Sequence, residues 1–470
     1  MRNVVLVCLD SVRTDFFDEF AHRIREQADT VYTQCRAASG WSLPSHASMF
    51  SGELPHLHGV HTHARDFTRI DRNESFVGEL PEHTSIGVSA NMYAGRNYGF
   101  DSFFDSFTEI AHTSEFQFER ALSPKHLDRS DLGYSAYVRL ALQDSRPIRS
   151  LANGVLLRIN PFDVLFSGRP WPELRDKGTA DVLSEAKAQI VAEERPARPV
   201  FAFLNVMDAH VPMYHHQGLN RELHSVPNAW TSKGGPTAKE VSHNTETYRK
   251  YLENYRQLYA ASIDYLDRLV AAWVDELRRE TENQTTVIIT ADHGENLGFE
   301  ADEFLFDHHT SLSEAILHVP LVLIDPPDGY PELVSRRVSH LELGDLVVAL
   351  ARDTPFRFDD EPVTAEVIGH TGENPGGAYW DRAIRCVYDG STKTIWDSLG
   401  TCKQFDLTAD SSDTQRLIDI DTNGFPTADT TRFEMSILDA KRTAIEREIH
   451  ADARTLDETA KRRLEGLGYM

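Results

Sequence analysis

The run Val4-Val5-Leu6-Val7-Cys8-Leu9, which ends at Asp10, decides the fold of this chain. It is uniformly apolar and rich in β-branched residues, as are strands buried on both faces of a parallel sheet. Similar runs recur at residues 200–206, 286–290 and 319–324. Charged helical stretches separate these runs, the longest over residues 248–280. The sequence therefore predicts an α/β domain with helices on both faces of a mostly parallel sheet.

Three of these apolar runs lead directly into polar clusters. The clusters are Asp10-Ser11, Met207-Asp208-Ala209-His210 and Ala291-Asp292-His293. In open α/β sheets, ligands bind beyond the carboxyl ends of the strands. We therefore expect the three clusters to converge on one site.

The second part of the chain has a different pattern. Short strand-like segments at residues 382–387, 393–396 and 402–407 are followed by a charged helix predicted over residues 436–466. This pattern is typical of an antiparallel subdomain, so we assign residues 1–340 to a catalytic α/β domain and residues 341–470 to a C-terminal subdomain. Residues 110–195 and 213–246 are polar and irregular, and we expect insertions over the site there, with His63, His215 and His216 at the surface.

The chain is strongly acidic, with 73 Asp and Glu against 48 Lys and Arg and a net charge of -25. Only ten of the basic residues are lysine. An acidic surplus with scarce lysine predicts adaptation to high salt, where screening relieves self-repulsion; the alternative is a moderately acidic enzyme from an ordinary environment. A nucleic-acid partner is not expected, because the sequence offers no basic patch for phosphates.

Cysteine spacing and hydropathy suggest the compartment. Cys8, Cys35, Cys386 and Cys402 show no metal-ligand spacing, and we expect free thiols. The longest apolar runs are of strand length, so no membrane span is predicted. The first strand has no cleavage site behind it, so we expect no signal peptide and a cytoplasmic location.

The most specific pattern is Ser42-Leu43-Pro44-Ser45-His46-Ala47-Ser48-Met49-Phe50-Ser51-Gly52, which continues to Pro55 and His58-Gly59-Val60. It resembles the signature of the sulfatase family of the alkaline phosphatase superfamily, in which Cys or Ser, any residue, Pro, Ser and Arg precede a helix. Ser42 falls on the nucleophile position. A nucleophile just before a helix N-terminus lies at the positive end of the helix dipole, which favours an anionic substrate.

The resemblance also implies a fold and a metal site. The fold is the alkaline-phosphatase-like three-layer sandwich, with a smaller antiparallel C-terminal subdomain. Asp10 resembles the first metal ligand of the family, and Asp292-His293-Gly294-Glu295 resembles its Asp-His/Asn-Gly-Glu motif. The expected ligands of one divalent cation are Asp10, Ser42, Asp292 and His293, and Ca²⁺, Mg²⁺, Mn²⁺ and Zn²⁺ all remain open. Asp208 with His210 supplies only part of a second ligand set, so one metal is expected.

Further site residues follow from the same resemblance. His210 matches the family histidine that contacts the transferred group, and either His308 or His309 matches its later His/Lys position. Gly99-Phe100-Asp101 and residues 463–469 also resemble the family, so the resemblance spans both ends and the middle of the chain. We expect catalytic roles for Ser42, His46, His210 and His308 and substrate-binding roles for Asn91 and His309.

The chain departs from the family pattern at three places. His46 replaces the Arg that is read by the machinery converting the nucleophile to formylglycine. Residues 89–96 lack the Lys-x-His element, and Ser11 replaces the usual second Asp. These departures make formylglycine at Ser42 doubtful and bring the site closer to relatives with an unmodified hydroxyl, in which Asn91 or Arg96 would help hold phosphoryl oxygens.

The sequence thus predicts a sulfatase-like, metal-dependent hydrolase that cleaves a sulfuric ester through a nucleophile at Ser42. The alternative is a phosphodiesterase- or phosphotransferase-like enzyme that uses unmodified Ser42 on a phosphate ester. A small molecule, a glycan or a lipid head group would carry the ester. Each motif alone has a structural interpretation, such as a helix cap at Asp10 or Ser42, and an inactive scaffold or a metal-storage protein are other classes. Four clusters in family order favour the enzyme.

Overall fold

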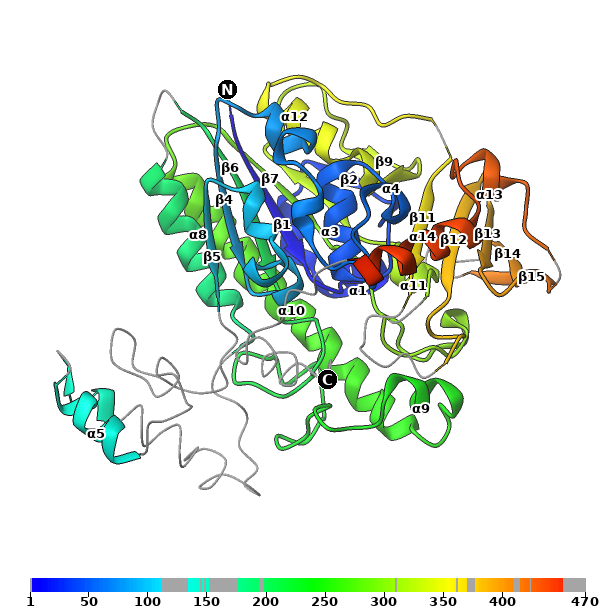
Figure 1. Ribbon diagram of the computed structural model, residues 1–470. Helices are drawn as coiled ribbons and strands as arrows, with labels where there is room; N and C mark the ends of the chain where they lie inside the picture. The colour runs from blue at the N-terminus through cyan, green and yellow to red at the C-terminus, as the bar shows by residue number, and fades with distance from the viewer. Residues whose placement is uncertain are drawn as a thin grey trace.

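Figure 1 shows a computed structural model of the chain. The structure describes residues 2–110, 134–143, 146–147, 149–151, 176–193, 198–308, 311–360, 362–369, 377–408, 415–422 and 424–450. His309, residues 463–469 and the last part of the predicted C-terminal helix lie outside the described residues.

A large sheet forms the centre of the molecule, in the strand order β5-β4-β6-β1-β7-β8-β2-β9. Its strands are β5 (Ser106–Glu109), β4 (Thr84–Ser89), β6 (Val200–Val206), β1 (Asn3–Leu9), β7 (Thr285–Thr290), β8 (Leu321–Ile324), β2 (Thr30–Tyr32) and β9 (Leu333–Val334). The pairs from β5 to β7 are all parallel, whereas β8 is antiparallel to both β7 and β2. The mostly parallel sheet predicted from the sequence is confirmed.

Helices cover both faces of this sheet (Figure 1). On one side lie α8 (Thr179–Glu193) and the long α10 (Arg249–Glu280), which packs against α8, α1 (Thr14–Phe20) and α2 (His22–Gln27). On the other side α12 (Leu343–Ala351) packs against β1 and α3 (Ser42–Ser51). Sheet and helices therefore form three layers.

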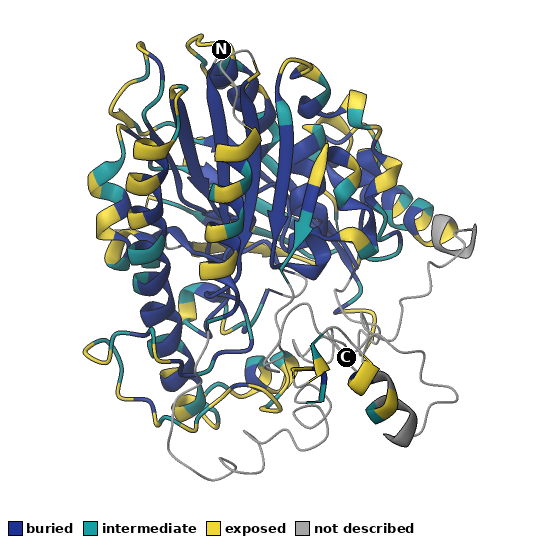
Figure 2. Ribbon diagram, turned by 90° about the vertical axis from the view of Figure 1, so that its left-hand side faces the viewer, coloured by how far each residue is buried: buried dark blue, intermediate teal, exposed yellow. Residues whose placement is uncertain are grey.

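The central strands are buried on both faces, as their apolar sequences require. Every residue of β1, β6 and β7 is buried, and Figure 2 shows the strands as a continuous buried layer. Each fully buried Val, Leu or Phe side chain contributes roughly 1.5–3 kcal/mol of transfer free energy. Asn205 is a buried polar residue within the otherwise apolar strand β6.

The strands β4 and β5 at one side of the sheet were not evident in the sequence. β4 has the sequence TSIGVS, which is short and interrupted by Gly87. The structure explains this glycine, because a Cβ at position 87 would lie 2.4 Å from the Phe107 ring of the neighbouring strand. Tertiary contact therefore selects a residue that weakens the local strand signal.

A second sheet follows, in the order β11-β12-β13-β14-β15, with every pair antiparallel. Its strands are β11 (Thr364–Ile368), β12 (Ala383–Asp389), β13 (Thr392–Asp397), β14 (Cys402–Asp406) and β15 (Arg416–Asp421), and α14 (Ile437–His450) packs on β12. The predicted antiparallel C-terminal sheet is confirmed. The division after residue 340 stays a prediction, and the packing of α12 on β1 and α3 favours a boundary after α12.

Two expectations from the sequence were wrong. Residues 179–193, expected within an irregular insertion, form α8 and pack on β4 and β6. His215 and His216, expected at the surface, are buried; the His216 ring lies 4.7 Å from the Tyr265 ring of α10.

All four cysteines are free thiols, as expected. Among the described residues, no helix is long and apolar enough to cross a membrane.

A buried charged network joins the C-terminal sheet to the segment before α3. Glu366 of β11 accepts hydrogen bonds from the backbone and the ring of His56 at 2.7 and 2.9 Å, and from Arg385 Nε at 2.7 Å. Its backbone N–H donates to Ala38 O at 3.0 Å, and its carbonyl accepts from the Ser39 hydroxyl at 2.6 Å. The network therefore fixes the segment that leads to Ser42.

Replacing Glu366 with glutamine is expected to destabilise the fold by about 3 kcal/mol at pH 7. Burial raises the pKa of Glu366, but His56 and Arg385 outweigh it and lower the pKa to about 2. A lowered carboxyl pKa contributes stability above the unfolded value and loses it as pH falls. The difference between wild type and Glu366→Gln should therefore shrink between about pH 5 and pH 2.

Urea unfolding at several pH values measures this difference. Glu276→Gln is the matched control, because Glu276 is exposed and pairs only with Lys187 among the ion pairs of the described residues. An equal loss in both variants, or a loss independent of pH, would contradict the assigned role of Glu366.

Candidate active site

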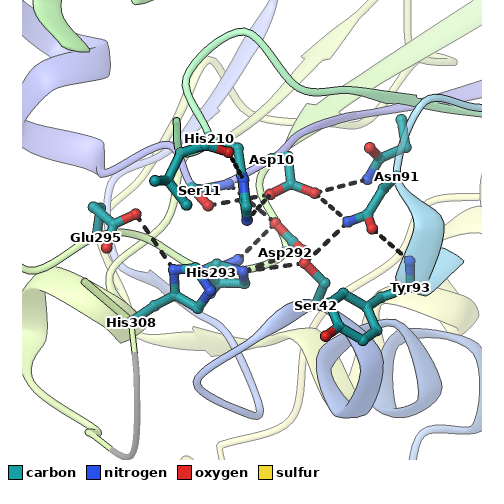
Figure 3. A network of polar contacts seen from close by, with 12 residues as sticks. Asp10, Ser11, Ser42, Asn91, Tyr93, His210, Asp292, His293, Glu295 and His308 are labelled. Carbon is teal, nitrogen blue, oxygen red and sulfur yellow. Dashed lines mark hydrogen bonds and ion pairs between the residues drawn. The ribbon is translucent and has the colours of Figure 1, made fainter. Parts of the chain in front are cut away.

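The polar clusters that follow β1, β6 and β7 meet at one edge of the large sheet. Because β1 lies between the other two strands and parallel to both, their carboxyl ends are adjacent. The Ser11 N–H donates to Asp292 Oδ1 at 3.2 Å, and His210 Nε2 lies 4.0 Å from Asp10 Oδ1. Figure 3 shows these side chains pointing toward one another. The clusters converge as the sequence predicts.

Ser42 enters the site from the other face of the sheet, as the first residue of α3. Its hydroxyl oxygen accepts a hydrogen bond from Asn91 Nδ2 at 3.0 Å and lies 3.3 Å from His293 Nε2. The side chain is buried. At this position the oxygen lies at the positive end of the α3 dipole, which stabilises negative charge on it.

Asp10 and Asp292 form a pair of buried carboxylates. Asp10 Oδ2 accepts from Asn91 Nδ2 at 2.5 Å and from Asn205 Nδ2 at 3.3 Å, and Oδ1 accepts from the Ser11 hydroxyl at 3.1 Å. Burial and then the charge of Asp292 raise the pKa of Asp10. Burial acts on Asp292 in the same direction, but the nearby imidazoles of His293 and His46 outweigh it and lower its pKa. The pair creates a local need for positive charge.

His293 completes a donor set that fits a divalent cation. Its Nδ1 donates to the Gly294 carbonyl at 2.8 Å, which leaves the Nε2 lone pair facing Ser42 and, at 3.5 Å, Asp292 Oδ2. Burial lowers the pKa of His293 to about 4, so the ring is neutral. The ligand atoms of Asp10, Asp292 and His293 lie within 4.8 Å of one another. Two carboxylates and one imidazole suit Ca²⁺, Mg²⁺, Mn²⁺ and Zn²⁺ without selecting among them.

The glycine of the Asp-His-Gly-Glu segment has a packing role. A Cβ at Gly294 would lie 2.0 Å from the Ala315 carbonyl oxygen. The Gly294 N–H also donates to Ile316 O at 2.8 Å. This close approach holds the turn after β7 and therefore the direction of the His293 ring.

Asn91 connects the nucleophile position with the carboxylates. Its amide nitrogen donates to both Ser42 Oγ and Asp10 Oδ2, while its Oδ1 accepts from the Tyr93 N–H at 2.7 Å. The Tyr93 contact fixes the amide orientation, because only the oxygen can accept. The structure thus places Asn91 against the candidate metal ligands Asp10 and Ser42.

His210 and His308 lie on the side of the site opposite Asn91 (Figure 3). The His308 ring is 5.3 Å from the ring of His210 and 4.6 Å from that of His293. Its Nδ1 lies 3.0 Å from Asp307 Oδ1 and 3.3 Å from Glu295 Oε2. Burial lowers the pKa of His308, but these carboxylates outweigh it and raise the pKa well above the usual value. His308 therefore brings a positive charge to the site.

His210 has the opposite electrostatics. Burial and then the charge of His308 lower its pKa, so the ring is neutral. Its Nδ1 donates to the Val211 carbonyl at 2.6 Å, which leaves Nε2 toward Asp10. His309 lies outside the described residues, so the choice between His308 and His309 stays a prediction.

His46 is placed behind the site rather than in front of it. Its Nδ1 donates to the Ser42 carbonyl at 2.6 Å, and its Nε2 accepts from Asn205 Nδ2 at 3.3 Å. The ring packs edge-on against Phe100 and Phe203, and burial lowers its pKa. With both ring nitrogens in hydrogen bonds to the protein, His46 orients the start of α3.

Arg96 does not point at the site, which corrects one expectation. Its guanidinium donates to Asp101 Oδ2 at 3.3 Å and to the Phe107 carbonyl, and its side chain is 53% exposed. The carboxylate and the exposed location hold the charge in solvent, where the desolvation cost is small.

Four residues at or beside the site were missed by sequence reasoning. They are Asn205, Glu295, Asp307 and Lys177. Asn205 could have been found as a polar residue near the end of an apolar strand. Glu295 is the last residue of the Asp-His-Gly-Glu motif that begins at Asp292. Asp307 and Lys177 lie in irregular segments with no pattern to mark them.

Comparisons with known proteins agree with this fold. The family model described as Sulfatase matches residues 2–353. The phosphonate monoester hydrolase of Agrobacterium radiobacter superimposes with a TM-score of 0.57 at 15% identity, covering 98% of this chain and 97% of that one. A protein crystallised with its substrate D-glucosamine-2-N,6-O-disulfate gives 0.52 at 12% identity, with 97% and 100% covered. A 2-O GAG sulfatase gives 0.51 at 14% identity, with 97% and 94% covered.

One curated relative matches a shorter region. The uncharacterized sulfatase YidJ of Escherichia coli (strain K12) is 25% identical over 169 residues, which are 34% of this chain and 33% of the relative. The chain therefore matches about a third of the length of that curated relative. The solved structures share the fold of this chain.

Proposed function

Because this chain belongs to the sulfatase family, we propose that it is a metal-dependent hydrolase that cleaves a sulfuric ester through a nucleophile at Ser42. The observation that carries the proposal is the meeting of Ser42, Asp10, Asp292 and His293 at one buried point. Neither a scaffold nor a metal store needs a hydroxyl beside the donor set. The oxygen at position 42 is the attacking atom in the proposal.

The proposed metal ligands are Asp10, Ser42, Asp292 and His293. A divalent cation bound there would polarise the ester and favour the ionised nucleophile. Among the chain's own groups, Asn91 holds the Ser42 oxygen in place. The neutral His210 ring keeps its Nδ1–H on the Val211 carbonyl and turns its Nε2 lone pair toward Asp10, where it is proposed to accept a hydrogen bond from a substrate group. His308, held protonated by Asp307 and Glu295, is the proposed donor of a proton to the leaving oxygen.

His46 is proposed as a positioning residue, because both its ring nitrogens bind protein groups. His309 stays a proposed substrate contact on the basis of its sequence position. A sulfated or phosphorylated small molecule, glycan or lipid head group is the proposed substrate. The neighbour solved with D-glucosamine-2-N,6-O-disulfate supports a sulfated sugar.

A phosphate or phosphonate ester is the second candidate, with the Ser42 hydroxyl itself as nucleophile. His46 occupies the position of the arginine that directs formylglycine formation, and its ring is bonded to the Ser42 carbonyl. This departure favours an unmodified serine. The similar fold of a phosphonate monoester hydrolase supports the same alternative.

Mass spectrometry of the peptide that contains Ser42, from protein made in its native host, tests the two candidates. Loss of two hydrogens would mean formylglycine and support sulfuric ester hydrolysis. An unmodified serine, together with turnover of aryl phosphate diesters or phosphonate monoesters in preference to aryl sulfates, would support the second candidate. Turnover of neither ester class after metal is added would overturn the proposed function.

The acidic surplus supports a further proposal, that the protein is adapted to high salt within the cytoplasm. The net charge of -25 predicts self-repulsion that salt relieves. The thermal unfolding midpoint is expected to rise between dilute buffer and molar KCl. A midpoint that does not change with KCl would refute the adaptation.

A further inference from the structure

Lys177 is a fully buried lysine directly before α8, with 2% of its surface exposed. Lysine is almost never buried unless its charge is paired and its protons are bonded. No motif in the sequence marks this residue. Its burial therefore needs a structural reason.

The Lys177 ammonium is bound by a single neighbouring segment. Its Nζ donates to the carbonyl of Asp208 at 3.1 Å and to the carbonyl of His210, and it lies 3.9 Å from Met213 Sδ. The ammonium also lies 5.5 Å from the centre of the Tyr214 ring. This segment follows β6 and contains His210. The Lys177 side chain therefore binds the backbone on both sides of that histidine.

Asp208 returns the contact in the opposite direction. Its Oδ1 accepts from the Lys177 backbone N–H at 3.1 Å, and its Oδ2 accepts from the Thr179 hydroxyl. His216 Nε2 lies 3.5 Å from Oδ1. The carboxylate is buried and supplies the counter-charge to Lys177. Both Asp208 oxygens therefore bind residues 177 and 179.

We propose that Lys177 and Asp208 form a reciprocal clasp that positions His210. The clasp consists of the Lys177 ammonium on the carbonyls of residues 208 and 210 and the Asp208 carboxylate on residues 177 and 179. It fixes the direction of the His210 ring, whose Nε2 lies 4.0 Å from Asp10 Oδ1. Among the described residues, the Lys177 ammonium contacts residues 208–214 and none of the proposed metal ligands, so Lys177 is a positioning residue. This inference rests on the proposed function of His210.

The test is Lys177→Met, which keeps the length of the side chain and removes the charge and its donors. We expect kcat to fall roughly 10- to 100-fold with KM within about twofold, because a misplacement of about 1 Å can cost on the order of 100-fold in rate. Lys187→Met is the matched control, since Lys187 lies on α8 and pairs with Glu276 and Glu280 at the protein surface. The control should keep the wild-type kcat.

A double variant separates positioning from general damage. If Lys177 acts through His210, Lys177→Met should lower kcat no further in a His210→Ala background. Additive losses would overturn the clasp as a device for His210. Thr179→Val, which removes only the hydroxyl bound to Asp208, replaces Lys177→Met if the latter does not fold, and a milder loss with the same non-additivity is expected.

A crystal structure of the variant distinguishes failure of the clasp from failure of the proposed function. Displacement of residues 208–214 with lowered kcat supports the inference. An unmoved His210 overturns the clasp. Full activity of His210→Ala would refute the role of His210 in the proposed function, and the clasp would then be judged by the displacement alone.

Discussion

Ser42→Ala is expected to lower kcat by at least about 1,000-fold, because the substitution removes the atom proposed to attack the ester. The rest of the site keeps Asn91, the two carboxylates and the histidines. The fold should be nearly unaffected, since among the described residues the hydroxyl contacts only side chains of the site. Loss of one such hydrogen bond costs about 1 kcal/mol. Steady-state turnover of the best aryl ester, together with thermal unfolding, measures both effects.

Ser48→Ala is the matched control for this prediction. Ser48 lies on the same helix and is buried like Ser42, but its hydroxyl lies 3.2 Å from His58 Nε2. Its removal should cost stability of a similar size and leave kcat within about twofold. Retention of full activity by Ser42→Ala would remove Ser42 from the mechanism, whereas equal losses in both variants would show that the effect comes from α3 as a whole.

Asp292→Asn is expected to abolish tight binding of the divalent cation and, with it, turnover. The substitution keeps the shape of the side chain and the Oδ1 contacts with the Ser11 and His293 N–H groups. It removes one of the two charges that attract the cation. It also removes the like charge that, after burial, raises the pKa of Asp10.

Calorimetry and thermal unfolding after treatment with a chelator test this second prediction. Wild type should bind one divalent ion per chain and gain about 2.7 kcal/mol at a free-ion concentration 100 times Kd, while Asp292→Asn should gain almost nothing. Restoring activity ion by ion also identifies the metal. Asp389→Asn, at the exposed end of β12, should behave as wild type. Chelated wild type that retains full activity would contradict the metal requirement.

Much of this architecture could be predicted from the chain alone. The apolar runs at Val4–Leu9 and Val200–Val206 are buried strands because local patterning reports burial on both faces directly. Asp10 and Asp292 converge because each ends a parallel strand, and parallel strands bring their carboxyl ends to one edge. Ser42 was found through its motif, and the structure starts α3 at that residue.

Other features depended on contacts between distant segments. Arg96 carries the charge expected of an anion ligand, yet Asp101 and the Phe107 carbonyl hold it at the surface. His216 stands in a polar segment, yet it is buried against α10. Hydropathy and spacing describe the residues near each position in sequence, and they do not report which distant partner a polar side chain will meet.

The sequence by itself determined the central strands, their polar ends, the place of Ser42 in the family motif and the family, because each of these is encoded within a few neighbouring residues. Only the tertiary structure decided that Lys177 binds the segment of His210, that His46 turns to the Ser42 carbonyl, and that Glu366 joins the C-terminal sheet to the segment before Ser42. The reason is energetic: a buried charge must find its partner wherever the folded chain supplies one, and these partners lie far away in sequence or are selected by packing.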